Sequence, residues 1–293
     1  MPAPSPAVIA AIDDLGLAAR LVVEGVRAGD HRSPFHGYNA EFQQHRAYRA
    51  GDDLKHLDWK LLARTDRLYS KQFRETTSMA AMLVLDASAS MAFPDGGISK
   101  FRYASVVAAA LAYLIATQGD AVGLLAVAHD SPSYLPARGG RPHLRTLFAQ
   151  LDRIRPGGRW QPTRAIGRAA DLLKRRGMIL VLSDFYDDED AVRRELRRVA
   201  RFGHDVAMLQ VISPEERALT YRGEVELEDL ESGARRLVHA PAIAADYATA
   251  VTDFLARVRD DARRDGIDYA LFATDEPPER ALRAFLLPRD AHA

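Results

Sequence analysis

Short apolar runs alternate with helical patterns over the last three quarters of the chain. Four of these runs are bounded by polar residues and are continuous enough to be strands buried on both faces of a sheet. The predicted strands are Met79–Leu85, Val122–Ala128, Met178–Leu182 and Val206–Ile212. A shorter strand is expected at Tyr269–Phe272.

Apolar residues recur at helical spacing between these runs. The predicted helices are Lys100–Thr117, Arg141–Ile154, Pro162–Arg175, Asp188–Phe202, Ala242–Asp265 and Pro278–Leu287. Strands that alternate with helices favour a mainly parallel sheet with helices on both faces. We therefore predict a Rossmann-like α/β fold.

The first part of the chain has a different pattern. An opening helix is expected from Pro6 to about Gly29, but residues 31–77 show few helix or strand signals and many charged and aromatic residues. A stretch of this length without clear elements is unusual in a compact domain unless it is functional or packed on something. We divide the chain into residues 1–77, expected to pack on the sheet, and residues 78–293, expected to form the α/β domain.

Two interpretations of residues 31–77 stay open. In the first, buried ion pairs hold the segment against the sheet; the candidates are Arg46, Arg49, Asp52, Asp53, Asp58 and Arg64. In the second, its Tyr, Trp and Arg residues form an interaction surface, because these residues are enriched at interfaces. A hairpin predicted at Glu224–Asp229 and Arg235–His239 is either an extension of the sheet edge or a docking surface.

Composition and charge narrow the function classes. The chain has 293 residues with a formal net charge of zero, whereas binding to nucleic acid or an anionic membrane favours a basic excess. Arginine pairs such as Arg193-Arg194 and Arg197-Arg198 are mixed with acidic residues and are typical of solvated helix faces. The absence of cysteine excludes disulfides and cysteine-ligated zinc.

The N-terminal composition and the length of the apolar stretches predict a cytoplasmic location and no direct membrane span. Residues Met1–Leu15 contain no Lys or Arg, so they do not have the basic start of a secretory signal. The longest apolar stretch, Val106–Ala116, is shorter than the ~20 residues that span a bilayer.

Candidate chemistry lies at the end of the first predicted strand. Asp86, Ser88 and Ser90 follow this strand in the sequence Asp86-Ala87-Ser88-Ala89-Ser90. Ligands of open α/β sheets bind outside the carboxyl ends of the strands, where a loop can direct alternate side chains at one point. A carboxylate and two hydroxyls are hard oxygen donors that suit Mg²⁺ or Mn²⁺. The competing interpretation is that Ser88 and Ser90 are turn residues or N-caps of the helix near Lys100.

Two further oxygen-bearing residues occupy comparable places. Asp184 follows the strand Met178–Leu182, and Thr163 stands at the start of a helix after Gly157-Gly158. A metal bound directly by hydroxyls and through water by carboxylates keeps little negative charge around it. An Asp or Glu carboxylate from a partner protein would then fill an open position, so the pattern favours binding over catalysis.

A phosphatase-like hydrolase that depends on Mg²⁺ is the alternative. Such an enzyme also places an Asp after a strand, and Asp184, Asp187 and Asp188 would supply its later acidic motif. Its mechanism needs a second Asp two residues after the first as a general acid. Ser88 occupies that position, which disfavours the hydrolase.

The Asp-x-Ser-x-Ser sequence, with a Thr in a second loop and an Asp after a later strand, resembles the metal-ion-dependent adhesion site of von Willebrand factor type A domains. This resemblance implies that Asp86, Ser88, Ser90, Thr163 and Asp184 bind one divalent metal. Pro162 precedes the Thr where the family usually has Gly, and Phe185 follows the Asp where many members have Gly.

The preceding region narrows the resemblance to the domain of unknown function 58 family. The matching sequences are residues 36–42, 46–54 and 56–60, continued by Ala63-Arg64-Thr65 and Phe73-Arg74-Glu75. This family implies a bacterial, non-enzymatic protein that acts with a MoxR-type AAA+ ATPase in the assembly or maturation of protein complexes.

Overall fold

A computed structural model of the chain describes most of the α/β domain and parts of the N-terminal region. The described residues are 5–27, 41–47, 61–62, 64, 68–74, 79–94, 97–128, 131–186 and 189–290. Asp187 and Asp188, proposed above for the hydrolase alternative, lie outside these ranges.

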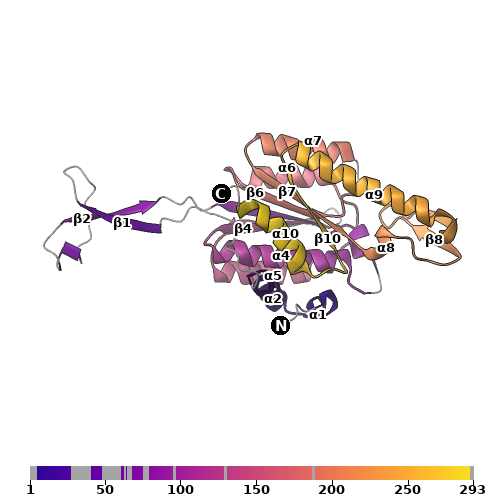
Figure 1. The fold of residues 1–293 in the computed structure, drawn as a ribbon, viewed down its shortest axis with the longest axis horizontal. Helices are drawn as coiled ribbons and strands as arrows, with labels where there is room; N and C mark the ends of the chain where they lie inside the picture. The colour runs from indigo at the N-terminus through magenta and orange to yellow at the C-terminus, as the bar shows by residue number, and fades with distance from the viewer. Residues whose placement is uncertain are drawn as a thin grey trace.

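A six-stranded sheet forms the centre of the molecule (Figure 1). In spatial order its strands are β10 (Asp268–Ala273), β7 (Asp205–Ile212), β6 (Met178–Ser183), β3 (Ala80–Asp86), β4 (Ala121–Ala128) and β5 (Ser131–Arg138). Every neighbouring pair is parallel except β4 and β5, which are antiparallel. The predicted α/β fold with a mainly parallel sheet is confirmed.

Helices cover both faces of this sheet, because its strands are apolar on both sides. One layer contains α2 (Leu15–Arg27), α4 (Lys100–Thr117), α5 (Arg141–Arg153) and α10 (Pro278–Asp290). The other contains α6 (Pro162–Leu172), α7 (Glu189–Arg201) and α9 (Ala240–Arg264). Along β3 the side chains alternate between the two cores, with Leu83 and Leu85 toward the first layer and Met82 and Val84 toward the second.

Helix α4 lies in the middle of its layer. By length and composition it is the one helix within the described ranges that is long and apolar enough to cross a membrane, yet 78% of that window is buried inside the fold. It contacts the sheet on one side and α2 and α5 on the other. This double coverage accounts for its apolar surface.

The structure differs from the predicted elements in two places, and each difference has a local reason. Strand β5 was not predicted because Pro132 and Pro136 interrupt its sequence, but a strand at a sheet edge tolerates proline. The single opening helix is divided into α1 (Pro6–Ala10) and α2. The division occurs because the Asp14 carboxylate accepts hydrogen bonds from the backbone N–H groups of Gly16 and Leu17 and starts a new helix.

Two small sheets stand beside the main one. Strands β1 (Glu41–Ala47) and β2 (Tyr69–Arg74) pair with each other, so part of the segment expected to lack clear elements is extended (Figure 1). Of the residues proposed there for buried ion pairs, Arg46 lies on β1 and Arg64 is exposed. The others lie outside the described residues: Arg49, Asp52, Asp53 and Asp58.

Strands β8 (Glu224–Glu228) and β9 (Arg235–His239) form the predicted hairpin. They belong to a sheet of their own, so the hairpin does not extend the six-stranded sheet. A short helix, α8 (Pro214–Arg217), lies between β7 and this hairpin along the chain.

The strand order places a topological switch between β3 and β6. From β3 the chain continues to β4 and β5 on one side, then returns through α5 and α6 to β6, β7 and β10 on the other side. Ligands of open α/β sheets bind outside the carboxyl ends of the strands at such a switch point. Asp86 and Asp184 follow these two strands.

Candidate functional site

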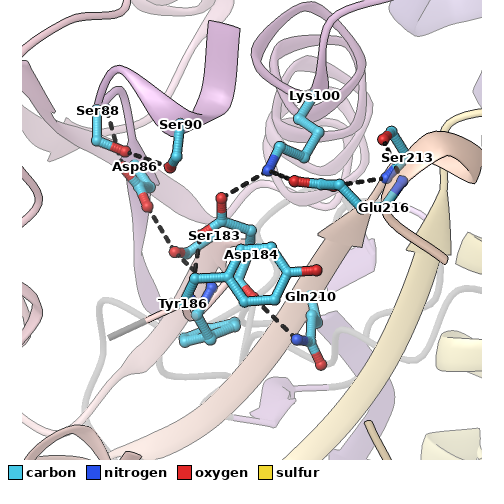
Figure 2. A network of polar contacts seen from close by, with 11 residues as sticks. Asp86, Ser88, Ser90, Lys100, Ser183, Asp184, Tyr186, Gln210, Ser213 and Glu216 are labelled. Atoms are coloured by element: carbon cyan, nitrogen blue, oxygen red, sulfur yellow. Dashed lines mark hydrogen bonds and ion pairs between the residues drawn. The ribbon is translucent and has the colours of Figure 1, made fainter. Parts of the chain in front are cut away.

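The first loop gathers the three oxygen donors predicted from the sequence (Figure 2). Asp86 ends β3, and its Oδ1 accepts a hydrogen bond of 2.8 Å from the backbone N–H of Ser88. The Oγ atoms of Ser88 and Ser90 lie 3.0 Å apart. Asp86 and Ser88 are fully buried, whereas Ser90, the first residue of the 3₁₀ helix η2 (Ser90–Ala92), is half-buried.

Neighbouring strands and loops fix the course of this loop. The backbone N–H of Ala87 donates to the carbonyl of Val127 on β4, and the carbonyl of Ala87 accepts from Gly157. The backbone N–H of Ala89 donates to the carbonyl of Gly158. The Gly157-Gly158 loop is thus fastened to the Asp86 loop by two backbone hydrogen bonds, which keeps the first loop's side chains in place.

Ser88 and Ser90 are turn residues but not caps of α4, so only the capping half of the competing interpretation is wrong: the backbone N–H of Met91 donates to the Ser88 carbonyl, and Ser90 starts η2. Helix α4 is capped by Ser99, whose side chain accepts a hydrogen bond from the backbone N–H of Arg102. The hydroxyls of Ser88 and Ser90 face each other instead.

Ser183 connects the loop after β6 to Asp86. Its Oγ donates a 2.5 Å hydrogen bond to Asp86 Oδ2 and accepts one of 3.0 Å from the backbone N–H of Phe185. Phe185 has a positive φ of 57°, a left-handed conformation that glycine adopts more readily. Phe185 tolerates this conformation while its ring is buried in the core beneath α7 and α9. The turn is further held by Gln210, whose amide donates to the Asp184 carbonyl.

Asp184 faces a lysine in the structure. Lys100 Nζ lies 2.7 Å from Asp184 Oδ2 and also forms an ion pair with Glu216 Oε1. The Lys100 side chain is fully buried, Asp184 is 3% exposed and Glu216 is 16% exposed. The ring of Tyr186 lies against the ammonium, with its centroid 5.1 Å from Nζ (Figure 2). One cation therefore lies between two carboxylates under an aromatic ring.

Helix α8 holds the far side of this cluster. Glu216 Oε2 accepts a hydrogen bond from the backbone N–H of Ser213, and the Ser213 hydroxyl accepts from the backbone N–H of Glu216. This reciprocal capping box fixes Glu216 at the end of β7. The carboxyl ends of three adjacent strands, β3, β6 and β7, thus carry Asp86, Asp184 and Glu216.

The two buried carboxylates have different electrostatic surroundings. Burial, together with the charge of Asp184, raises the pKa of Asp86 to about 7, although hydrogen bonds from Ser183 and Ser88 partly oppose this rise. Burial alone would lower the pKa of Lys100, but Asp184 and Glu216 reverse this and raise it, so the ammonium stays charged. Asp184 has a cation as its partner, whereas Asp86 has neutral donors.

Thr163 is the predicted site residue that the structure does not bring into this cluster. It is the second residue of α6, and its side chain is exposed. Within the described ranges its hydroxyl makes no hydrogen bond to Asp86, Ser88 or Ser90. Its assignment as a ligand stays a prediction that rests on the family resemblance.

The residues present fit a hard divalent cation in part. A buried carboxylate with a raised pKa and two adjacent hydroxyls from one loop offer the oxygen donors that Mg²⁺ and Mn²⁺ prefer. No group of three or more His, Cys, Asp or Glu that could hold a metal occurs among the described residues. The candidate site therefore depends on hydroxyls, and its later-loop carboxylate is already paired with Lys100.

Sequence reasoning missed Lys100, Ser183 and Glu216. One signal was present, because Lys100 is the first residue of α4, where the helix dipole disfavours a cation. A lysine there needs another source of stabilisation, which Asp184 and Glu216 provide. The pairing itself joins residues 84 and 116 positions apart, so spacing along the sequence does not reveal it.

The alternatives gain no direct support from the described geometry. The hydrogen-bond partners of the Asp86 carboxylate within the described ranges are Ser88 and Ser183, and neither supplies the acid that a hydrolase requires. Arg193 and Arg197 both form ion pairs with Asp265, so much of the basic character of α7 is neutralised within the fold.

The strand order defines an α/β domain with a mainly parallel sheet, and solved structures that include a von Willebrand factor A domain are similar to it. BatB from Bacteroides thetaiotaomicron is 17% identical, with a TM-score of 0.48, over 74% of this chain and 100% of that chain. The structure described as the SpRpn10 VWA domain is 13% identical, with a TM-score of 0.43, over 70% of this chain and 94% of that chain. These likenesses concern the fold alone.

The chain belongs to the family described as "Protein of unknown function DUF58", which matches residues 44–256. The uncharacterized protein Rv1480 of Mycobacterium tuberculosis strain H37Rv is similar to it, with 31% identity over 274 residues that cover 92% of this chain and 86% of that protein. Family membership predicted from the N-terminal sequences is thereby confirmed.

The predicted cytoplasmic location is contradicted by the comparisons. A structure from Bacteroides fragilis, 16% identical with a TM-score of 0.47 over 74% of this chain and 100% of that chain, is described as an aerotolerance-related membrane protein. The cytoplasmic assignment is not retained.

Proposed function

We propose that the protein is a non-enzymatic interaction module in which Mg²⁺ or Mn²⁺, held by the Asp86 loop, receives a carboxylate from a protein partner. The single observation that carries this proposal is the convergence of the Asp86 carboxylate with the hydroxyls of Ser88 and Ser90 at the topological switch point. A divalent cation there would supply an electrophilic position for an oxygen ligand.

The chain's own residues would organise that position. Ser88 and Ser90 contribute neutral oxygens, so the cation would keep most of its charge toward an incoming ligand. Ser183 orients the Asp86 carboxylate by donating to Oδ2. The expected partner ligand is an Asp or Glu side chain, and the family resemblance favours a MoxR-type AAA+ ATPase as the protein that provides it.

Metal binding is tested by isothermal titration calorimetry with MnCl₂ and MgCl₂ on the purified chain. We expect saturable binding that Asp86→Ala removes, because Asp86 is the carboxylate of the first loop. The matched control is Asp253→Ala, which changes an exposed aspartate on α9 and should leave binding intact. Failure of the native chain to bind either metal at millimolar concentration would overturn the metal dependence.

Partner binding is tested separately. Pull-down of a MoxR-type ATPase from the same organism by the immobilised chain should be lost with EDTA and with Asp86→Ala, and retained with Asp253→Ala. Retention under all of these conditions would show that any interaction uses another surface and does not need the metal.

A further inference from the structure

We infer that Lys100 is an internal competitor of the metal: its ammonium holds Asp184 away from the cation site, with Glu216 as the second anchor of the ammonium. This inference rests on the proposed metal site and deepens it, because it assigns to one buried residue the control of how many carboxylates the metal can use.

Geometry provides the first argument. Asp184 is the residue that the resemblance assigns to the metal, yet its Oδ2 accepts from Lys100 Nζ at 2.7 Å and its Oδ1 accepts from the backbone N–H of Tyr186 at 3.2 Å. Both oxygens of the carboxylate are therefore engaged, one by the Lys100 ammonium and the other by the backbone of Tyr186. In Figure 2 the Asp184 side chain reaches toward Lys100, while Asp86 lies beside the two serines.

Burial provides the second argument. A lysine with 0% exposure is rare, because its charge must be compensated where water does not reach. Lys100 has two carboxylate partners and the face of Tyr186 around it. A divalent cation that recruited Asp184 would have to break one of these ion pairs and leave Lys100 with Glu216 alone.

Position in the fold provides the third argument. Glu216 is fixed by its capping box, and its carbonyl accepts a hydrogen bond from the Tyr247 hydroxyl on α9. The anchor of Lys100 is thus independent of the Asp86 loop. Lys100 can keep one partner while Asp184 is released, so the exchange does not require the ammonium to leave the protein interior.

The test is a double-mutant cycle on Mn²⁺ affinity, measured by calorimetry and by the electron paramagnetic resonance signal of free Mn²⁺. The variants are Lys100→Met, Asp184→Asn and the two combined. Competition predicts that Lys100→Met tightens Mn²⁺ binding by about tenfold, within the range typical of residues that orient metal ligands. In the Asp184→Asn background the same change should alter affinity by less than about twofold, because no carboxylate remains to be released.

A purely electrostatic or structural role of Lys100 gives a different pattern. Loss of a nearby positive charge would tighten Mn²⁺ binding equally in the native and Asp184→Asn backgrounds, and equal gains would overturn the inference. If removal of Lys100 alone unfolds the chain, Lys100→Met combined with Glu216→Gln leaves a single carboxylate in the cluster and is compared with the same pair carrying Asp184→Asn.

The outcomes separate this inference from the proposed function. If the native chain binds no Mn²⁺ but Lys100→Met binds it through Asp184, the competition stands and the proposed metal dependence of the native chain fails. If the native chain binds Mn²⁺ and Asp184→Asn weakens binding as much as Asp86→Ala does, the proposed function stands and the competition fails. If neither the native chain nor the Lys100 variants bind, both fail.

Discussion

Asp86 and Asp184 occupy equivalent places, yet the protein treats their charges in opposite ways. Each follows a central parallel strand, and each is almost completely buried. Burial, together with the nearby charge of Asp184, raises the pKa of Asp86 to about 7, and the hydrogen-bond donors to Asp86 are neutral. Asp184 is instead paired with a buried ammonium. One edge of the sheet thus holds a carboxylate whose described partners are neutral beside a carboxylate that is paired with a cation.

The largest expected effect on stability is at Lys100, the cation that is paired with Asp184. Lys100→Met should lower the free energy of unfolding by about 3–5 kcal/mol, because it leaves Asp184 and Glu216 buried without their counter-charge. Urea unfolding followed by circular dichroism measures this. Adding Glu216→Gln should recover part of the loss. The control Lys174→Met, at an exposed lysine, should stay within ~0.5 kcal/mol. Equal effects at the two lysines would remove the distinction between the carboxylates.

A second effect, spread over several pH units, is expected from the titration of Asp86. Because the pKa of Asp86 is raised from 3.8 in the unfolded chain to about 7 in the folded one, the folded state binds more protons in this interval. Without divalent metal, stability should therefore fall as pH rises from about 4 to 7, with a contribution from Asp86 of up to about 1.4 kcal/mol per pH unit.

The matched variant for this effect is Asp86→Asn. It should show a flatter dependence of unfolding free energy on pH between 4 and 7, while the contribution of Glu216, whose pKa is also raised by burial, remains. An identical slope in the native chain and the variant would mean that Asp86 is compensated as well as Asp184 is.

The hydrogen bonds of Ser183, which connect the loop after β6 to Asp86, are expected to have a moderate effect on stability. Ser183→Ala removes the hydroxyl that donates to Asp86 and accepts from the backbone N–H of Phe185. The loss of two buried hydrogen bonds should cost about 1–3 kcal/mol in urea unfolding and raise the pKa of Asp86 further. Unchanged stability and an unchanged pH dependence would show that Ser183 does not orient the Asp86 carboxylate.

The smallest effect is expected at Thr163. Its exposed side chain predicts that Thr163→Ala changes the unfolding free energy by less than ~0.5 kcal/mol. Mn²⁺ affinity should change by less than about threefold, against the roughly 10- to 100-fold losses typical of groups that support a metal. A loss of about tenfold or more in calorimetry would place Thr163 at the metal and complete the set of ligands implied by the family resemblance.

The sequence by itself determined five of the six strands of the main sheet and the first loop of the site. The apolar runs at Met178–Leu182 and Val206–Ile212 are strands because both faces of a central strand are covered, which makes their pattern continuous and easy to recognise. Asp86, Ser88 and Ser90 are neighbours in sequence, so a single loop was enough to predict that they converge.

Only the tertiary structure decided which partner each later residue has. Lys100, Asp184 and Glu216 come from α4, the end of β6 and α8, and they meet because the strand order places β6 between β3 and β7. The same order left Thr163 exposed at the start of α6. Local patterns report burial and turns within a few residues, whereas the pairing of buried charges depends on which strands become neighbours.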